Sequence, residues 1–199
     1  MHITDGVLST QTLIISSAVS AVFLIASIRS TKEHELPQIA LFSALFFIAS
    51  FIHIPVGISS AHLILSGLIG ASIGFGCFLA IFVALFLQAL LFGFGGLSSL
   101  LSNTLVMALP AYLLYLGNSL IFKKSFGTLR IVLDFAIGSL STLFSALLLS
   151  LLLYTSNDAL APAAISILIA HIPLSIVEGI ITAAGMSFYR RIALSASIA

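Results

Sequence analysis

Charged residues are scarce in this chain: only 7% of its 199 residues are Asp, Glu, Lys or Arg, whereas 60% are hydrophobic. The mean hydropathy is +1.28, a balance that would leave a water-soluble globule with too little polar surface. A membrane-spanning helix needs roughly 20 mainly apolar residues, so the chain has room for about six to eight. The composition therefore predicts an all-α polytopic membrane protein with a single transmembrane domain over residues 1–199.

Several signatures of other protein classes are also missing. Cys77 is the one cysteine, which excludes an internal disulfide and a Cys-based zinc or iron–sulfur site. The net charge of +1 gives no basic surface for nucleic acid. No Gly-x-x-x-x-Gly-Lys-Ser/Thr or His-Glu-x-x-His pattern occurs. We therefore expect no catalytic residues, no ATP site in this chain and no prosthetic group.

Apolar runs separated by breaks predict helices in seven places: near 9–28, 38–53, 60–74, 77–93, 97–121, 130–153 and 160–188. With seven helices, all 7 Lys and Arg residues lie on one side of the membrane, whereas six or eight would scatter them. Because basic residues concentrate on the cytoplasmic side, we expect about seven transmembrane helices, an outward N-terminus and a cytoplasmic C-terminus. The start lacks the basic region of a secretory signal, so Met1 is expected to be the mature N-terminus.

The segments expected outside the membrane contain histidines at positions 2, 53 and 62. A free Met1-His2 terminus offers the α-amine, the His2 backbone nitrogen and the His2 imidazole Nδ1, which can close two chelate rings on one metal. One further imidazole would complete a square-planar set of four nitrogens, which suits Ni2+ or Cu2+. The N-terminus is therefore a candidate metal site.

His62 is the candidate for the fourth nitrogen. We expect Ser59 and Ser60 to cap the helix predicted over 60–74, so that His62 lies in its first turn. The positive end of the helix dipole would then keep the imidazole neutral, as a metal ligand must be. The alternative is an ordinary hydrogen-bonded histidine at the membrane interface.

Other polar residues have two interpretations each. Asp5 either accepts a hydrogen bond from a ligating imidazole or belongs, with Gly6, to an ordinary turn. Glu178 lies inside the last predicted helix, where a carboxylate is a functional candidate, but a structural polar cluster with Asn103 or Gln88 is favoured. His53 and His171 are spare ligand candidates that more often have structural roles.

Four segments resemble the CbiM/NikM family, the substrate-capture subunits of energy-coupling-factor transporters for cobalt and nickel. They are Met1-His2-Ile3-Thr4-Asp5-Gly6-Val7-Leu8-Ser9, the stretch from Ile54 to Leu63, the stretch from Gln88 to Leu97 with Asn103 and Met107, and His171-Ile172-Pro173 with Glu178-Gly179 and Thr182. The chain departs from the family pattern at two positions: Phe94 stands where an Asp is usual, and Val106 where an Asn would follow Asn103.

The resemblance implies that Met1, His2 and His62 bind the ion, with Asp5, Asn103 and His53 as possible neighbours of the ligands. It also implies Ni2+ or Co2+ as the transported substrate, a link to cobalamin biosynthesis, and a place in the cell (inner) membrane. The implied partners are a transmembrane coupling subunit, two cytoplasmic ATPases and a small accessory membrane subunit. The departures leave the choice between the two ions open.

Two further interpretations compete with metal capture. A vitamin-capture subunit of the same transporter class would need a large aromatic pocket, and this chain has no Trp and only 4 Tyr. A divalent-cation carrier would line its path with several carboxylates, but only Glu178 lies well inside a predicted helix. Capture by imidazole would weaken below about pH 6.5, the ordinary pKa of histidine.

Overall fold

The computed structural model describes residues 2–56, 59–122 and 126–196, and the side chains of these residues except 53–56, 59–61 and 193–196. They form seven α-helices, three 3-10 helices and one two-stranded hairpin. The α-helices are α1 (Thr10–Ser30), α2 (Leu36–Ala49), α3 (Ser66–Ile73), α4 (Cys77–Phe92), α5 (Leu100–Ile121), α6 (Gly127–Ser156) and α7 (Ala161–Ala196). The strands are β1 (His53–Val56) and β2 (Ser59–His62), and the 3-10 helices are η1 (Glu33–Glu35), η2 (Gly74–Gly76) and η3 (Asp158–Leu160).

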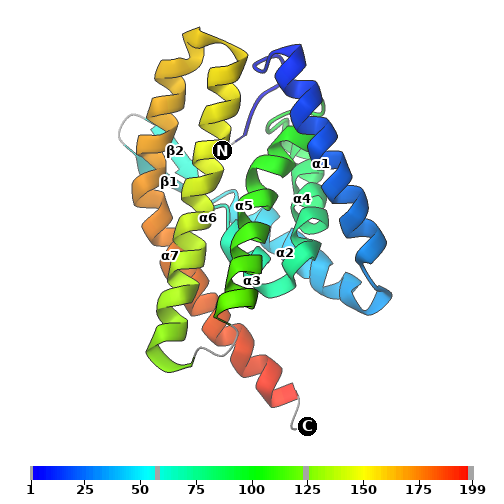
Figure 1. The fold of residues 1–199 in the computed structure, drawn as a ribbon, viewed down its shortest axis with the longest axis vertical. Coiled ribbons are helices and arrows are strands. Elements are labelled where there is room, and N and C mark those ends of the chain that lie inside the picture. The colour runs from blue at the N-terminus through cyan, green and yellow to red at the C-terminus, as the bar shows by residue number, and fades with distance from the viewer. Residues whose placement is uncertain (1, 57–58, 123–125, 197–199) are drawn as a thin grey trace.

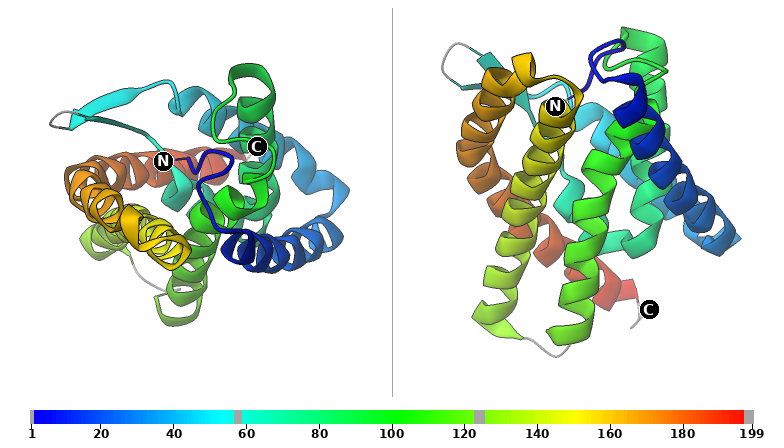
Figure 2. Two further views of the ribbon diagram at one scale, coloured as in Figure 1. Left: turned by 90° about the horizontal axis from the view of Figure 1, so that it is seen from above. Right: turned by 45° about the horizontal axis from the view of Figure 1, so that its top comes forward.

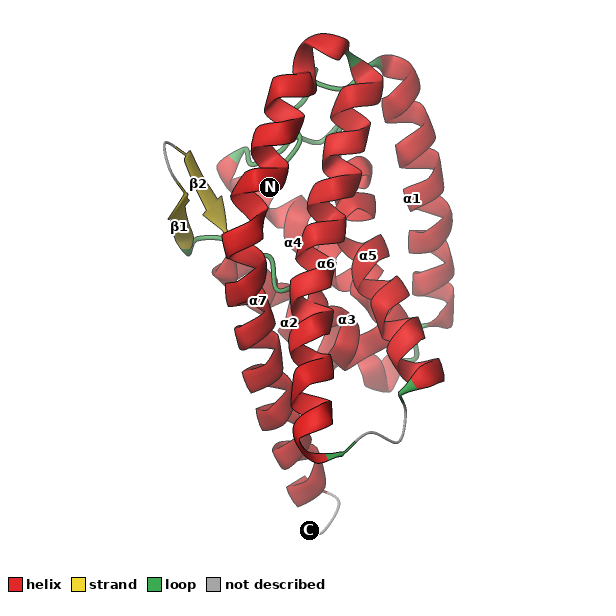
Figure 3. Cartoon of the chain, turned by 60° about the vertical axis from the view of Figure 1, so that its left-hand side comes forward, coloured by secondary structure: helices red, strands yellow, loops and turns green. Residues whose placement is uncertain are grey.

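The long helices run roughly along one axis and form a bundle (Figure 1). α1 begins and α6 ends at the upper end of the bundle, whereas α7 ends at the lower end. The two views of Figure 2 show α6 and α7 side by side along most of their length. The hairpin lies outside the bundle beside α7 (Figure 3).

Five segments are long and apolar enough to cross a membrane: Thr10–Ser30, Ser66–Phe92, Leu100–Ile121, Gly127–Ser156 and Asp158–Ile192. Large apolar side chains cover their outer surfaces, including Val22, Leu90, Leu147 and Ile180, each more than half exposed. Such surfaces are stable in lipid but not in water. The predicted class, a helical multi-pass membrane protein, is confirmed.

The predicted helix over 60–74 is wrong at its beginning. Ser59–His62 form β2, which pairs antiparallel with β1 and places His62 opposite His53, and α3 begins only at Ser66. The helix predicted over 38–53 likewise ends at Ala49. His62 therefore does not lie in a first helical turn, and the dipole argument for its neutral state does not apply.

The predicted break between the helices over 60–74 and 77–93 is confirmed. Residues Gly74–Gly76 form η2 between α3 and α4, and Gly74 has a φ of +53°. A Cβ atom at Gly74 would lie 2.8 Å from the Tyr115 ring, so both the backbone conformation and the space favour glycine here. Because α3 has only 8 residues, it is too short to span a bilayer alone.

Basic residues gather at the lower end of the bundle. Arg29 lies in the last turn of α1, Arg130 near the start of α6 and Arg190 near the end of α7. The fully buried Asp134 forms ion pairs with both Arg130, at 2.9 Å, and Arg190. This cluster ties α6 to α7 at that end.

Candidate metal centre

The first residues of the chain are held inside the bundle by their backbone. The Ile3 N–H donates to Asn103 Oδ1 at 2.8 Å, and the Ile3 carbonyl accepts from Asn103 Nδ2 at 3.0 Å and from Ser99 Oγ at 2.7 Å. The Ile3 side chain packs in the hydrophobic core and is only 3% exposed. Asn103, on α5, therefore fixes the position of the residue that follows His2.

A second set of hydrogen bonds holds the N-terminal segment at Asp5, two residues after Ile3. The Asp5 N–H donates to the Gly95 carbonyl at 3.1 Å, and Asp5 Oδ1 accepts from the Ser99 N–H at 3.1 Å and from the hydroxyls of Ser98 and Ser99. The hydrogen bond from Ser98 is the main cause that lowers the pKa of Asp5. A Cβ atom at Gly96 would lie 2.2 Å from the Asp5 carboxylate, so the glycines allow this close approach.

The hydrogen bonds around Gln88 determine the tautomer of His2. Ser50 donates its hydroxyl proton to the Phe47 carbonyl at 2.7 Å, so Ser50 Oγ must accept from Gln88 Nε2, at 2.9 Å. Gln88 Oε1 then faces His2 Nε2 at 2.9 Å. Because this oxygen can only accept, the His2 proton is on Nε2 and the lone pair is on Nδ1.

His2 is also held in its neutral form. Burial and the positive charge of the N-terminal amine lower the pKa of His2 to about 4, although the hydrogen bond to Gln88 opposes them. At neutral pH the ring is therefore uncharged, with the lone pair on the nitrogen that the predicted chelate requires.

His62 lies next to His2. Their ring centroids are 4.8 Å apart with an interplanar angle of 30°, and His62 is only 6% exposed. His62 Nδ1 donates to the Leu63 carbonyl at 2.9 Å, which places the His62 lone pair on Nε2. Two imidazoles, that of His2 partly buried and that of His62 buried, thus come together from positions 60 residues apart in sequence.

Other predicted residues lie elsewhere or make other contacts. Met1 and the side chain of His53 lie outside what the structure describes. Asp5 hydrogen-bonds Ser98 and Ser99 and lies in a turn with Gly6, the second of its two interpretations. His171 Nδ1 donates to the Ile167 carbonyl within α7.

The hydrogen-bond partners of Glu178 differ from those expected. Glu178 accepts hydrogen bonds from the Ile64 and Leu65 N–H groups, not from Asn103 or Gln88. Phe94 lies with its ring centroid 6.0 Å from that of His2. Gln88 was missed as a partner of His2, and only its place in the segment that resembles the family marked it.

No three His, Cys, Asp or Glu side chains gather as a metal site among residues 2–56, 59–122 and 126–196. The candidate centre is therefore two imidazoles beside the backbone of the N-terminal segment. Such a set offers nitrogen ligands to a metal.

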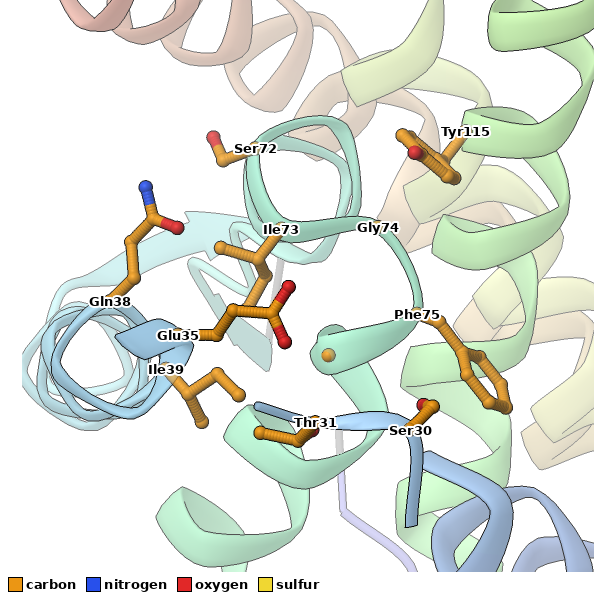
Figure 4. Close-up of a pocket in the computed structure, with 11 residues that line it drawn as sticks. Ser30, Thr31, Glu35, Gln38, Ile39, Ser72, Ile73, Gly74, Phe75 and Tyr115 are labelled. Atoms are coloured by element: carbon orange, nitrogen blue, oxygen red, sulfur yellow. The ribbon is translucent and has the colours of Figure 1, made fainter. Parts of the chain in front are cut away.

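A polar cavity of about 330 Å³ lies at the C-terminal end of α1, whereas the N-terminal segment lies at its beginning. Glu35, Gln38, Ser72 and Tyr115 are among its lining residues (Figure 4). It is also lined by Ser30, the last residue of α1, whereas the N-terminal segment enters beside the first. No histidine lines this cavity, so it is separate from the candidate metal centre.

Comparison with known proteins gives a consistent result. Residues 2–195 match the model of the CbiM family, described as the cobalt uptake substrate-specific transmembrane region. A Haemophilus influenzae protein named provisionally for metal transport is 34% identical over 184 residues, covering 92% of this chain and 89% of that protein. The cobalt transport protein CbiM of Clostridium tetani is 30% identical over 201 residues, covering 92% and 81%. A crystal structure of a transition metal transporter aligns with a TM-score of 0.83 and 25% identity, covering 96% of this chain and 93% of that one.

Proposed function

This chain belongs to the CbiM family, the substrate-specific transmembrane components of cobalt and nickel uptake, and from that premise we propose that it captures the ion with its own N-terminus. The family is a component of metal transporters, not a group of enzymes. In the proposed site, the Met1 amine, the His2 backbone nitrogen, His2 Nδ1 and His62 bind Ni2+ or Co2+ as the transported substrate.

The tautomer of His2 carries this proposal. The chain of hydrogen bonds through Ser50 and Gln88 leaves the lone pair on Nδ1, and only Nδ1 can close a six-membered ring with the His2 backbone nitrogen on one metal. Had Gln88 bound Nδ1 instead, the chelate could not form. Gln88 thus acts as an outer partner that orients a metal-ligating histidine.

The position of His62 supports a fourth nitrogen. Metal–nitrogen bonds of about 2.0–2.1 Å place neighbouring ligands about 2.9 Å apart. The two ring centroids, 4.8 Å apart, are close enough for small rotations to bring His2 Nδ1 and His62 Nε2 to that separation. Four nitrogens in a plane favour Ni2+ over ions that prefer oxygen.

We further propose that the chain works as the capture subunit of an energy-coupling-factor importer in the cell (inner) membrane. No P-loop pattern occurs in its sequence, so ATP hydrolysis would be supplied by two cytoplasmic ATPases through a transmembrane coupling subunit, with a small accessory membrane subunit. In this model the N-terminus faces outward and the basic end of the bundle faces the cytoplasm.

The test is a blocked N-terminus. Acetylation of the Met1 amine keeps every side chain but turns the terminal nitrogen into an amide, so the chelate loses its anchoring amine. We expect purified wild-type protein to bind Ni2+ at one ion per chain, and the N-terminally acetylated protein to lose it, as measured by metal analysis and isothermal titration calorimetry.

His34→Ala is the matched control, because His34 is exposed and lies in η1, beyond the far end of α1. Its Ni2+ binding should equal that of the wild type. Full metal retention by the acetylated protein would refute the N-terminal chelate.

A further inference from the structure

Glu178 is a carboxylate buried in the middle of α7, with 0% of its surface exposed. A buried charge is costly unless it is paired or strongly hydrogen-bonded. Asp134, which is equally buried, is paired with Arg130 and Arg190. The described hydrogen bonds of Glu178 instead come from backbone N–H groups, those of Ile64 and of Leu65, the latter at 3.0 Å. Glu178 therefore binds a piece of main chain.

That main chain leads directly into α3. Leu65 is the N-cap residue, has a left-handed φ of +54° and offers no side-chain cap. A carboxylate at this end of a helix also interacts favourably with the helix dipole. Glu178 thus holds, from α7, the N-cap residue and the residue before it, where the local sequence offers no acceptor.

The position of Glu178 is itself fixed by close packing of α6 against α7. A Cβ atom at Gly138 would lie 2.6 Å from the Glu178 carbonyl, and one at Gly179 would lie 2.7 Å from the Phe135 ring. With glycine at both positions, the two helices approach closely on either side of Glu178. The carboxylate is therefore presented to α3 from a rigid support.

α3 is held equally tightly on its other sides. A Cβ at Gly67 would lie 2.6 Å from Gly138 Cα, and one at Gly70 would lie 2.7 Å from the Ala111 carbonyl. The beginning of α3 therefore has little freedom to shift while Glu178 holds it.

His62 is joined to this fixed point by a very short link. Only Leu63 separates it from Ile64, and the Leu63 carbonyl accepts from His62 Nδ1. The Leu63 N–H in turn donates to the Ile52 carbonyl at 3.2 Å. The backbone that carries His62 is thus anchored at Leu63, Ile64 and Leu65.

We infer that Glu178 is a positioning residue for the metal centre: by holding the Ile64 and Leu65 N–H groups, it sets the His62 imidazole against His2. Asn103 and Gln88 fix the N-terminal half of the centre, and Glu178 fixes the half that comes from β2. The inference deepens the proposed function and rests on it.

The test compares Ni2+ binding by Glu178→Ala, Glu178→Gln and wild-type protein in detergent, by calorimetry and by the visible absorption of the bound ion. Loss of an outer partner typically weakens metal binding by about 10–100-fold, and we expect this for Glu178→Ala. Glu178→Gln, which keeps one acceptor oxygen, should lose less. Both should shift the Ni2+ absorption band, because the His62 ligand is displaced from the plane.

Asp134→Asn is the matched control. It also removes a wholly buried carboxylate and should lower the melting temperature, but it lies at the other end of the bundle from His2. We expect its Ni2+ affinity and absorption band to equal those of the wild type. If Glu178 had a purely structural role, its variants would behave like Asp134→Asn, with a lower melting temperature but unchanged Ni2+ affinity and absorption band.

The outcomes separate the two proposals. If the wild type binds Ni2+ and either folded Glu178 variant binds it with the same affinity and the same absorption band, the positioning role is overturned and the capture function stands. If Glu178→Ala does not fold, Glu178→Gln decides. If the wild type binds no Ni2+ or Co2+, the proposed function fails, and the role of Glu178 fails with it.

Discussion

At the scale of single residues, the assignment of protons decides what the two histidines can do. His2 donates from Nε2 to Gln88, and His62 donates from Nδ1 to the Leu63 carbonyl. Each ring thus keeps its lone pair on one defined nitrogen. The burial that lowers the pKa of His2 to about 4 also makes it a ligand without prior loss of a proton.

The first prediction concerns pH. An unperturbed imidazole gains its proton near pH 6.5, but His2 in the folded protein should gain it only near pH 4. Between these values the unfolded chain binds more protons at His2 than the folded chain, so this residue makes the fold less stable as the pH falls. In metal-free protein with labelled histidines, we expect one ring resonance, absent in His2→Asn, to titrate with a midpoint near 4.

The low pKa of His2 changes the expected cause of the acid sensitivity of Ni2+ binding. A fall in Ni2+ affinity at low pH is still expected, but it should begin below about pH 8, because an α-amine with an ordinary pKa of about 7.7–8.0 must lose its proton to bind metal. His2 should add its own proton competition only near pH 4. A His2 ring that titrates near 6.5 would contradict this account.

The sequence was enough to select His2, His62 and Asn103, because chelate chemistry and the resemblance both concern short segments. It did not reveal that Gln88 sets the tautomer of His2, since the two residues are 86 positions apart. It also left Asp5 between a turn and an imidazole contact, and did not reveal its hydrogen bonds to Ser98 and Ser99. Contacts of this kind depend on how α4, α5 and the N-terminal segment pack, and no local pattern specifies that.

At the scale of elements, the largest difference between expectation and structure is the hairpin. Ser59-Ser60 before an apolar run is a typical helix start, yet these residues pair with Pro55 and Val56 in β1 and β2. The residues that lead into α3 are held instead by Glu178, 113 residues after Leu65. A cap supplied by another helix leaves no signal in the local sequence, which is why the start of α3 was misplaced.

The glycines of the loop after α4 give the second prediction. Gly96 has a φ of +137°, and an added Cβ would lie 2.2 Å from the Asp5 carboxylate. Gly96→Ala should therefore displace Asp5 and release the N-terminal segment. We expect a loss of about 10-fold or more in Ni2+ affinity, the effect typical of a disturbed outer partner, measured by calorimetry.

Gly93→Ala separates this clash from backbone strain. Gly93 also has a positive φ, +67°, but nothing lies within 4 Å of an added Cβ. The substitution should cost about 1–2 kcal/mol of stability, as for any L-residue in that conformation, and leave Ni2+ affinity unchanged. Equal losses of affinity in the two variants would show that strain, rather than contact with Asp5, is responsible.

At the scale of the whole molecule, the two ends of the bundle differ in chemistry. The two histidines and the N-terminal segment lie at one end, and Arg29, Arg130 and Arg190 mark the other. Five segments have the length and apolarity of full spans; α2 has 14 residues and α3 has 8. The bundle thus combines long outer helices with a short α3 whose first five residues, Ser66 to Gly70, are buried.

The last prediction tests the proposed orientation with two single cysteines. The native Cys77 is buried, so a membrane-impermeant maleimide should leave it unlabelled and give a low background. Ala159, in η3 between α6 and α7, and Glu33, in η1 between α1 and α2, are both exposed. Because basic residues stay on the cytoplasmic side, Ala159→Cys should be labelled in intact cells, and Glu33→Cys only after permeabilisation. Labelling of Glu33→Cys in intact cells would invert the orientation and place the two histidines inside, where they could not capture an external ion.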